Sequence, residues 1–527
     1  MGQSTSGTSL VANATEASRR VCYRFRVDWT DAGFGSTGSW TDESAYVKTA
    51  SGDHQAVSPL KSIATLGRGV SDKVTVTCRN PEASGGYSGL RFSPSNTNGP
   101  LYSYIASGGM FMKRAIFEMG IYNGGTAERL RQVTGYITDA DEDYEGRSIT
   151  FTIRDRGADA ALTQASTSLY TEYTSKQYMQ ALAALMERDA VAAADQQFDT
   201  GMMVTPYQWC DDESVWDEMG IVAEAQMGRI WFDKDGDLHF DDGSHFIKPS
   251  SNSYDDPTTS QATFAVTSFK NLQPQVRYDL IYNHIVLEYQ PRYIGQQQTV
   301  FSSGETVVVR PSSSLTLGYL PFNAEFRYPV YSVTTPVSGT DYVAVTAGGI
   351  DISSDISITM TSYASYADLH ITNTNSDEYT AYLVQLDLRG YPLLTEESGK
   401  YEVSDATSIA THGKRTLNIR NNPYIQSYRH AQAVGDFALA RFKEPIQRIR
   451  ISGVPARPWL EVGDRVTVTE TLTGTSGDWF IEGMSWQFTG KDYPMSLDLV
   501  SAGDLFAYTN YFTIGTSTYG TNGRLFW

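Results

Sequence analysis

The chain has 527 residues, 40% of them hydrophobic and 19% charged, so it is long enough to form several domains with buried cores. It carries 41 basic and 60 acidic residues, and this net charge of −19 argues against stable nucleic-acid binding, which requires Lys and Arg. The charge could also serve solubility alone. Three sparse cysteines exclude a disulfide framework, and the sequence contains no run of about 18 apolar residues that could span a membrane.

The amino-terminal part predicts a β domain. Residues 1–20 are rich in Ser, Thr and Ala and contain no signal peptide, which predicts a flexible arm and synthesis in a cytoplasm. From residue 21 onward apolar and polar residues alternate, as in half-buried strands. Cys22 and Cys78 fall within such patterns and are expected to be small core residues. We predict a β domain over residues 21–165.

Residues 166–262 change to helical patterns. Thr174-Ser175-Lys176-Gln177 has the form of a capping box ahead of an apolar stripe, which predicts a helix. Ser214 can cap a second helix, and Gly228 can end that helix in a left-handed conformation. We predict a small α+β domain over 166–262.

A hairpin is predicted directly after the second helix. Asp235-Gly236 lies between two apolar runs, 230–232 and 238–240, which is a strong turn signal. Asp233, Asp235 and Asp237 could suggest calcium, but an EF-hand loop has its Gly after the third ligand and a Glu at position twelve. Here Gly236 comes before the third Asp, two residues early, and position twelve is Ser244, so we predict a solvated turn rather than a metal site.

The second half of the chain alternates between strand-rich and helical patterns. Residues 263–329 predict a β segment, and 330–394 predict a peripheral, β-sandwich-like inserted module. A helix over 425–443, ended by Pro445, opens a domain at 395–505 that continues as a β unit. The tail 506–527 combines aromatic residues with Gly, which predicts a flexible segment that orders against a partner. The candidate partner-interface residues are Phe506, Tyr508, Tyr511, Phe512, Tyr519, Phe526 and Trp527.

The residues that could support catalysis do not form a recognisable set. An acidic run at 139–145 could supply paired carboxylates for glycoside hydrolysis, but nothing fixes their separation, so we predict an acidic loop between two strands. His239 and His245 have acids nearby but no converging ligands in the sequence. Phosphate-loop and nucleophile-elbow motifs are lacking. We therefore predict no enzyme activity and no catalytic, cofactor-binding or metal-binding residues.

Four passages together resemble the tail-tip hub proteins of long-tailed bacteriophages. They are the helix-then-hairpin segment 211–240, the segment 90–102, the segment 382–392 leading into 404–415, and the segment 458–486. Each passage is a pattern of turn and strand residues, and the four occur in the order of the family. Together they cover most of residues 20–500.

The resemblance implies a mainly β fold with a small α+β insert, in which tube-like β-barrel or sandwich domains form a multidomain hub. It implies a homotrimeric ring at the virion tail tip that closes the tail tube, adapts a sixfold tube to a threefold tip and takes part in channel opening for DNA ejection. The implied partners are the distal tail ring protein, the tail tube, the tape-measure protein and tail fibre or spike proteins. DNA would pass through an acidic lumen without binding stably.

Two other classes of function stay open. The first is a carbohydrate-binding adhesin with residues 330–394 as its sugar-facing module. The second is a cell-wall hydrolase that uses the acidic run. Some hub relatives carry a lysozyme, peptidase or adhesin extension, whereas here only the short aromatic tail follows residue 505.

Overall fold

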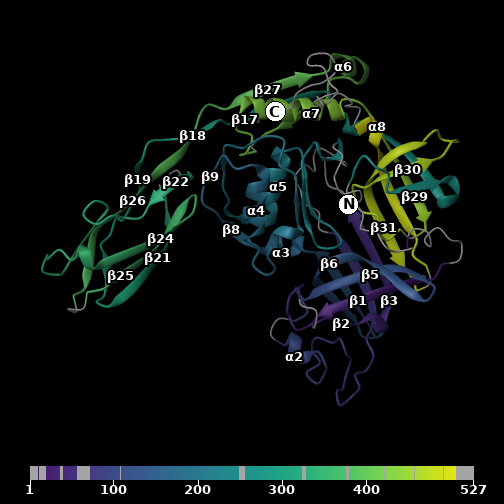
Figure 1. The fold of residues 1–527 in the computed structure, drawn as a ribbon, viewed down its shortest axis with the longest axis horizontal. Coiled ribbons are helices and arrows are strands. Elements are labelled where there is room, and N and C mark those ends of the chain that lie inside the picture. The colour runs from purple at the N-terminus through teal and green to yellow at the C-terminus, as the bar shows by residue number, and fades with distance from the viewer. Residues whose placement is uncertain are drawn as a thin grey trace.

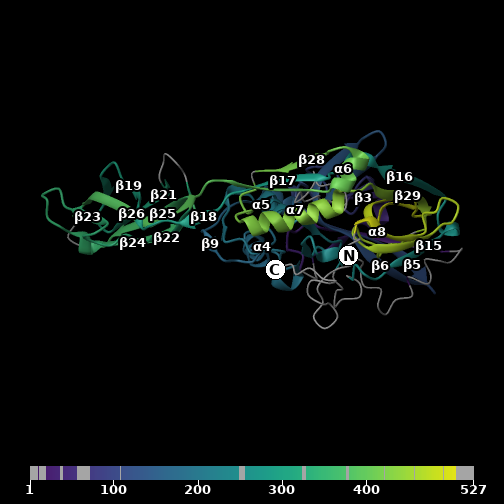
Figure 2. The same cartoon turned by 90° about the horizontal axis from the view of Figure 1, so that it is seen from above.

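The structure is a computed structural model that describes Leu10 and residues 19–35, 39–55, 72–106, 109–247, 256–322, 328–375, 379–420, 422–455, 457–490 and 492–505. Within these residues the fold is mainly β with a small helical part, as the sequence predicts. A large body carries a smaller β-sandwich that projects to one side (Figures 1 and 2). The predicted arm lies almost entirely outside the described residues, and the aromatic tail lies wholly outside them. No described helix is long and apolar enough to cross a bilayer.

One thirteen-stranded sheet forms the frame of the body. Its main path runs β16-β29-β32-β31-β3-β4-β7-β6-β5-β1-β2, and β30 and β15 extend it from β31. The amino-terminal strands are β1 (Val21–Asp28), β2 (Thr41–Asp42), β3 (Val47–Gln55), β4 (Lys73–Arg79), β5 (Arg114–Asn123), β6 (Thr126–Asp143) and β7 (Ser148–Asp155). The others are β15 (Ala262–Ala265), β16 (Asn271–Arg277), β29 (Ile446–Val454), β30 (Arg465–Thr469), β31 (Gly477–Phe488) and β32 (Met495–Ser501).

The two parts of this sheet meet where β3 pairs antiparallel with β31. Gly52 lies opposite Trp486 in this pairing. The Trp486 ring stacks on Phe117 with ring centroids 5.8 Å apart, so one apolar core continues across the joint. A Cβ on Gly52 would lie 2.3 Å from the Trp486 ring, so only glycine fits at this position. Cys22 and Cys78 are both buried, as predicted, and Cys78 belongs to this core.

The α+β part packs against the sheet near β6 and β7. Its helices are α3 (Gly157–Leu162), α4 (Ser175–Ala183) and α5 (Val215–Ala225). Its strands are β8 (Gln164–Ser166), β9 (Tyr170–Thr171), β10 (Gln196–Phe198), β11 (Tyr207–Gln208), β12 (Asp211–Ser214), β13 (Arg229–Phe232) and β14 (Leu238–Asp241). The predicted capping box at Thr174 and the Ser214 cap are both present, and β13 and β14 form the predicted hairpin.

The end of α5 differs from the prediction. Met227, with φ of 52°, takes the left-handed conformation that the sequence assigned to Gly228. Gly228 is needed for close approach instead, because a Cβ there would lie 2.3 Å from the carbonyl oxygen of Asp241 on β14. The acidic run also differs: residues 139–143 belong to β6 rather than to a loop, since their backbone pairs with β7.

A three-stranded sheet and a 15-residue helix run across the top of Figure 1, above α4 and α5, from the side of the projecting sandwich toward the carboxy-terminal strands. The strands are β17 (His284–Tyr289), β27 (Gly399–Ser404) and β28 (Thr416–Ile419), and the helix is α7 (Tyr428–Phe442). Shorter helices are α2 (Tyr102–Ile105), α6 (Ala406–His412) and α8 (Ala502–Leu505).

The projecting sandwich has its own core and is larger than the predicted module. Its strands are β18 (Arg292–Ile294), β19 (Gln298–Ser302), β20 (Val307–Val309), β21 (Ser313–Pro321), β22 (Val330–Thr334), β23 (Tyr342–Val345), β24 (Ile356–Ser362), β25 (Tyr366–Asn373) and β26 (Ala381–Thr395). Strand β26 pairs with β18, β19, β20, β22 and β23, while β21, β25 and β24 form the second sheet. Val300, Val309 and Phe322 belong to this core, so the predicted boundary at residue 330 falls inside the sandwich.

Candidate functional site

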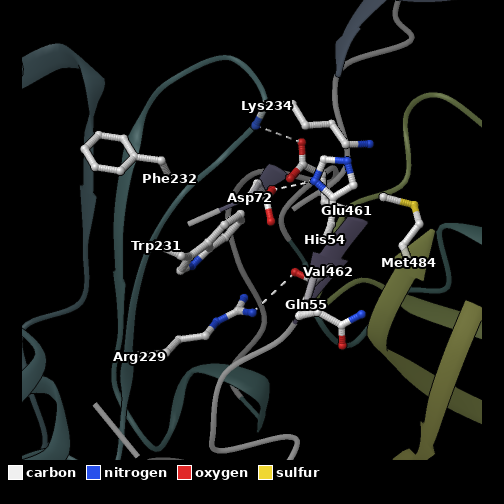
Figure 3. A pocket seen from close by; sticks show the side chains of 10 residues that line it. All are labelled: His54, Gln55, Asp72, Arg229, Trp231, Phe232, Lys234, Glu461, Val462 and Met484. Atoms are coloured by element: carbon white, nitrogen blue, oxygen red, sulfur yellow. Dashed lines mark hydrogen bonds and ion pairs between the residues drawn. The ribbon is translucent and has the colours of Figure 1, made fainter. Parts of the chain in front are cut away.

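A buried polar junction lies where the sheet, the β13–β14 hairpin and the carboxy-terminal segment meet (Figure 3). It surrounds a cavity of about 20 Å³, which has room for one water molecule. Ligand pockets usually span roughly 300–1,000 Å³, so this cavity belongs to a structural joint rather than to a substrate site. Its lining residues are His54, Gln55, Asp72, Arg229, Trp231, Phe232, Lys234, Glu461, Val462 and Met484.

His54 and Asp72 resemble part of a catalytic triad in this cavity but have structural partners instead. Nδ1 of His54 lies 2.6 Å from Oδ2 of Asp72, and Trp486 Nε1 donates to His54 Nε2 at 3.2 Å. The indole can only donate, so the proton of the neutral ring lies on Nδ1 and points at the carboxylate. Both ring nitrogens are thus occupied. The described residues that line the cavity include no Ser, Thr or Cys nucleophile.

Lys234 connects the hairpin turn to the carboxy-terminal segment. Its ammonium donates to the carbonyl oxygens of Pro458 and Leu460, and its backbone N–H donates to Glu461 Oε1 at 3.3 Å. Burial raises the pKa of Glu461 well above its usual value and lowers that of Lys234. These contacts fix the hairpin to a segment more than 220 residues away in the sequence.

A second buried ion cluster lies at the base of the same hairpin. Arg229 Nε donates to Asp241 Oδ2 at 2.6 Å, and Trp231 Nε1 donates to the same oxygen at 2.9 Å. Burial alone would raise the pKa of Asp241, but the charges of His245 and Arg229 hold it well below its usual range. Arg229 also donates to the Val462 carbonyl at 3.3 Å, so this cluster reinforces the same joint.

Asp199, Asp241 and His245 are the described residues that come closest to a metal site, with one ligand atom from each within 4.8 Å of the others. His245 Nδ1 lies 3.0 Å from Asp199 Oδ2 and 3.6 Å from Asp241 Oδ1. Burial lowers the His245 pKa, but Asp241 and Asp199 raise it above the ordinary value. When His245 is protonated, it and Arg229 balance the two carboxylates in an ion-pair network. The sequence did not indicate this convergence, because Asp199 lies 46 residues before His245.

The acids of the hairpin turn are engaged locally. Oδ1 of Asp233 accepts from the backbone N–H of Asp237 at 2.9 Å, and its Oδ2 lies 3.1 Å from His239 Nε2. Gly236 has φ of 91°, as the turn requires. In the acidic run, Glu142 accepts from Asn80 at 2.9 Å. The seven candidate interface residues between Phe506 and Trp527 lie outside the described residues.

Comparisons with solved structures give tail proteins that align along most of the chain. A tail protein from Neisseria meningitidis is 11% identical, covers 92% of this chain and 98% of its own, and has a TM-score of 0.47. The 43 kDa tail protein of a Shewanella oneidensis prophage is also 11% identical, with coverages of 92% and 99% and a TM-score of 0.45. A Listeria monocytogenes prophage tail protein is 7% identical, with coverages of 90% and 94% and a TM-score of 0.38.

No protein-family profile matches the sequence. A comparison with curated proteins gives no match either.

Proposed function

We propose that this protein is a structural tail-tip hub that closes the distal end of a phage tail tube as a homotrimer. The observation that carries the proposal is the β3–β31 pairing, which joins two β units far apart in the sequence into one sheet. Three such chains would place six β units around one axis, which is how the hub would adapt a sixfold tube to a threefold tip. The four hub-like passages of the sequence support the same function.

The buried charged groups of the body favour a structural protein over an enzyme. The cavity at the joint has room for only about one water molecule, and its charged groups contact other parts of the chain. An open hollow of about 690 Å³ also crosses the β3–β31 joint. Its four charged lining residues are balanced in sign: Asp53, Lys73, Arg450 and Asp498. If this face lines the channel, it would present no net positive charge to passing DNA.

The oligomeric state tests the proposal. Mass photometry of the full chain should give three times the 58.2 kDa chain mass, and antibodies raised against it should label the distal end of purified tails. A monomer or a hexamer, or labelling along the whole tube, would contradict the hub function. A chain without residues 292–395 should still form trimers, because the sandwich has a separate core.

A further inference from the structure

We propose that the outward face of the β21-β25-β24 sheet binds a neutral saccharide. This sheet is the lower layer of the projecting sandwich in Figure 1. Its inner face supplies core residues such as Leu369 and Ile371. The register places alternate residues of the three strands together on the outer face. These are Ser314, Thr316, Tyr319, Pro321, Ser357, Thr359, Thr361, Tyr366, Asp368, His370 and Thr372.

A row of tyrosine rings lies at one end of this face. The Tyr319 and Tyr366 ring centroids are 4.8 Å apart, and Tyr363 stacks on Tyr366 at 4.4 Å with 23° between the ring planes. Tyr319 is 54% exposed although it is a large aromatic residue. Sugar rings present flat faces of C–H groups, and an exposed aromatic ring provides a matching surface for such a face.

The backbone holds Tyr319 in a strained conformation. Its φ is 52°, which is uncommon and unfavourable for a bulky residue. A β-bulge between Leu317 and Leu320 creates this position, and Asp368 Oδ1 fixes it by accepting the Tyr319 N–H at 2.7 Å. A glycine at position 319 would adopt this φ without strain. The presence of a tyrosine instead indicates that its exposed side chain has a role at the bulge. Strain of this kind concentrates at ligand-binding positions.

The rest of the face supplies hydrogen-bonding groups of the kind that sugar hydroxyls need. Ser314 and Thr372 hydroxyls lie 2.9 Å apart, and the Thr316 hydroxyl lies 3.1 Å from His370 Nδ1. These groups occupy exposed or half-buried positions. Serine and threonine hydroxyls can both donate and accept, which allows them to pair with a polyol in either sense.

The composition of the face disfavours other ligands. Apart from Pro321, which lies opposite Tyr366, the outward positions of these three strands carry no aliphatic side chain, whereas the centre of a protein–protein interface is usually apolar. They carry no Lys or Arg, which nucleic acids and anionic lipids require. Asp368 would repel a sialylated or phosphorylated glycan. A neutral saccharide can pack its C–H face on the tyrosine rings and form hydrogen bonds with the Ser and Thr hydroxyls.

A glycan array tests the proposal with the full chain. The probes are neutral oligosaccharides of glucose, galactose, mannose and N-acetylglucosamine, printed beside sialylated and phosphorylated glycans. At least one neutral probe should bind, and Tyr319→Ala should weaken it roughly tenfold or more in calorimetry. Thr359→Lys, an exposed change that places a long charged chain on the face, should do the same.

Tyr293→Ala is the matched control, because Tyr293 is 44% exposed on β18 and lies outside this face. It should bind as the wild type does. Failure of every neutral probe, preference for the anionic glycans, or wild-type affinity in Tyr319→Ala would each overturn the proposal. The readout does not depend on trimer formation, so this result and the hub function can fail separately.

Discussion

Replacing Gly52 with alanine should open the joint between the two β units. The added methyl group would lie 2.3 Å from Cε2 of Trp486, far inside contact distance. The indole cannot yield easily, because it is 3% exposed, stacks on Phe117 and packs edge-on against Tyr493 at 5.3 Å. Overpacking of this kind costs about 1–3 kcal/mol. Displacing the ring also breaks its hydrogen bond to His54, which contributes about 1 kcal/mol.

The expected loss of about 2–4 kcal/mol should be confined to the joint. Amide hydrogen exchange in β3 and β31 should therefore quicken by roughly 30- to 700-fold, since each 1.4 kcal/mol is a factor of ten. The control is Gly304→Ala, where a Cβ meets nothing within 4 Å, and its exchange should match the wild type. Unchanged exchange across β3 and β31 in Gly52→Ala would refute the packing argument.

Three further outcomes follow from buried polar groups. Burial raises the pKa of Glu218 to about 7, against the hydrogen bonds from two tyrosines. Between pH 4.5 and about 7 the folded state therefore keeps the Glu218 proton, whereas the unfolded state releases it. The free energy of unfolding should consequently fall by about 3 kcal/mol as pH rises from 4.5 to about 7. Glu218→Gln should flatten this part of the stability profile, and an unchanged slope would contradict the assignment. Asp199→Asn should lower the His245 pKa in an NMR titration, because Asp199 helps to raise it. The wild-type protein should lose stability as pH rises through the folded pKa of His245, and the variant should lose less. Ser214→Ala should cost about 1 kcal/mol in thermal unfolding through loss of the α5 cap, whereas the exposed Ser354→Ala should leave the midpoint unchanged.

Local features of the fold were predictable because short-range chemistry decides them. The Ser214 cap and the hairpin at Asp235-Gly236 depend on residues within a few positions of each other. Gly228 shows the limit of this reasoning. A glycine at a helix end suggests a left-handed conformation, but here a side chain is excluded because the Asp241 carbonyl of β14 lies too close. The sequence carried no sign of that approach.

Long-range pairings were not predictable in the same way. The β3–β31 pairing joins residues more than 400 positions apart, and alternation alone cannot say which strands pair. The predicted sandwich boundary at residue 330 differs from the structure for the same reason. Val300 and Val309 follow ordinary strand patterns, and only their packing shows that they belong to the sandwich core. The Asp199–His245 contact and the contact between the Tyr319 and Tyr366 rings also arise only when distant segments come together.

The chain enters and leaves the sandwich through one place. Arg292 on β18 pairs with Thr395 on β26, so the two connecting strands run side by side. Beyond this stem, the link to the body includes the Ala364 N–H, which donates to the Thr167 carbonyl at 2.7 Å. The two ends of the sandwich are adjacent and its core is separate from that of the body. Recombination could therefore substitute another domain between residues 292 and 395 without altering the strand order of the body. If the sandwich binds a saccharide as proposed, such an exchange would change the ligand while the thirteen-stranded sheet stays the same.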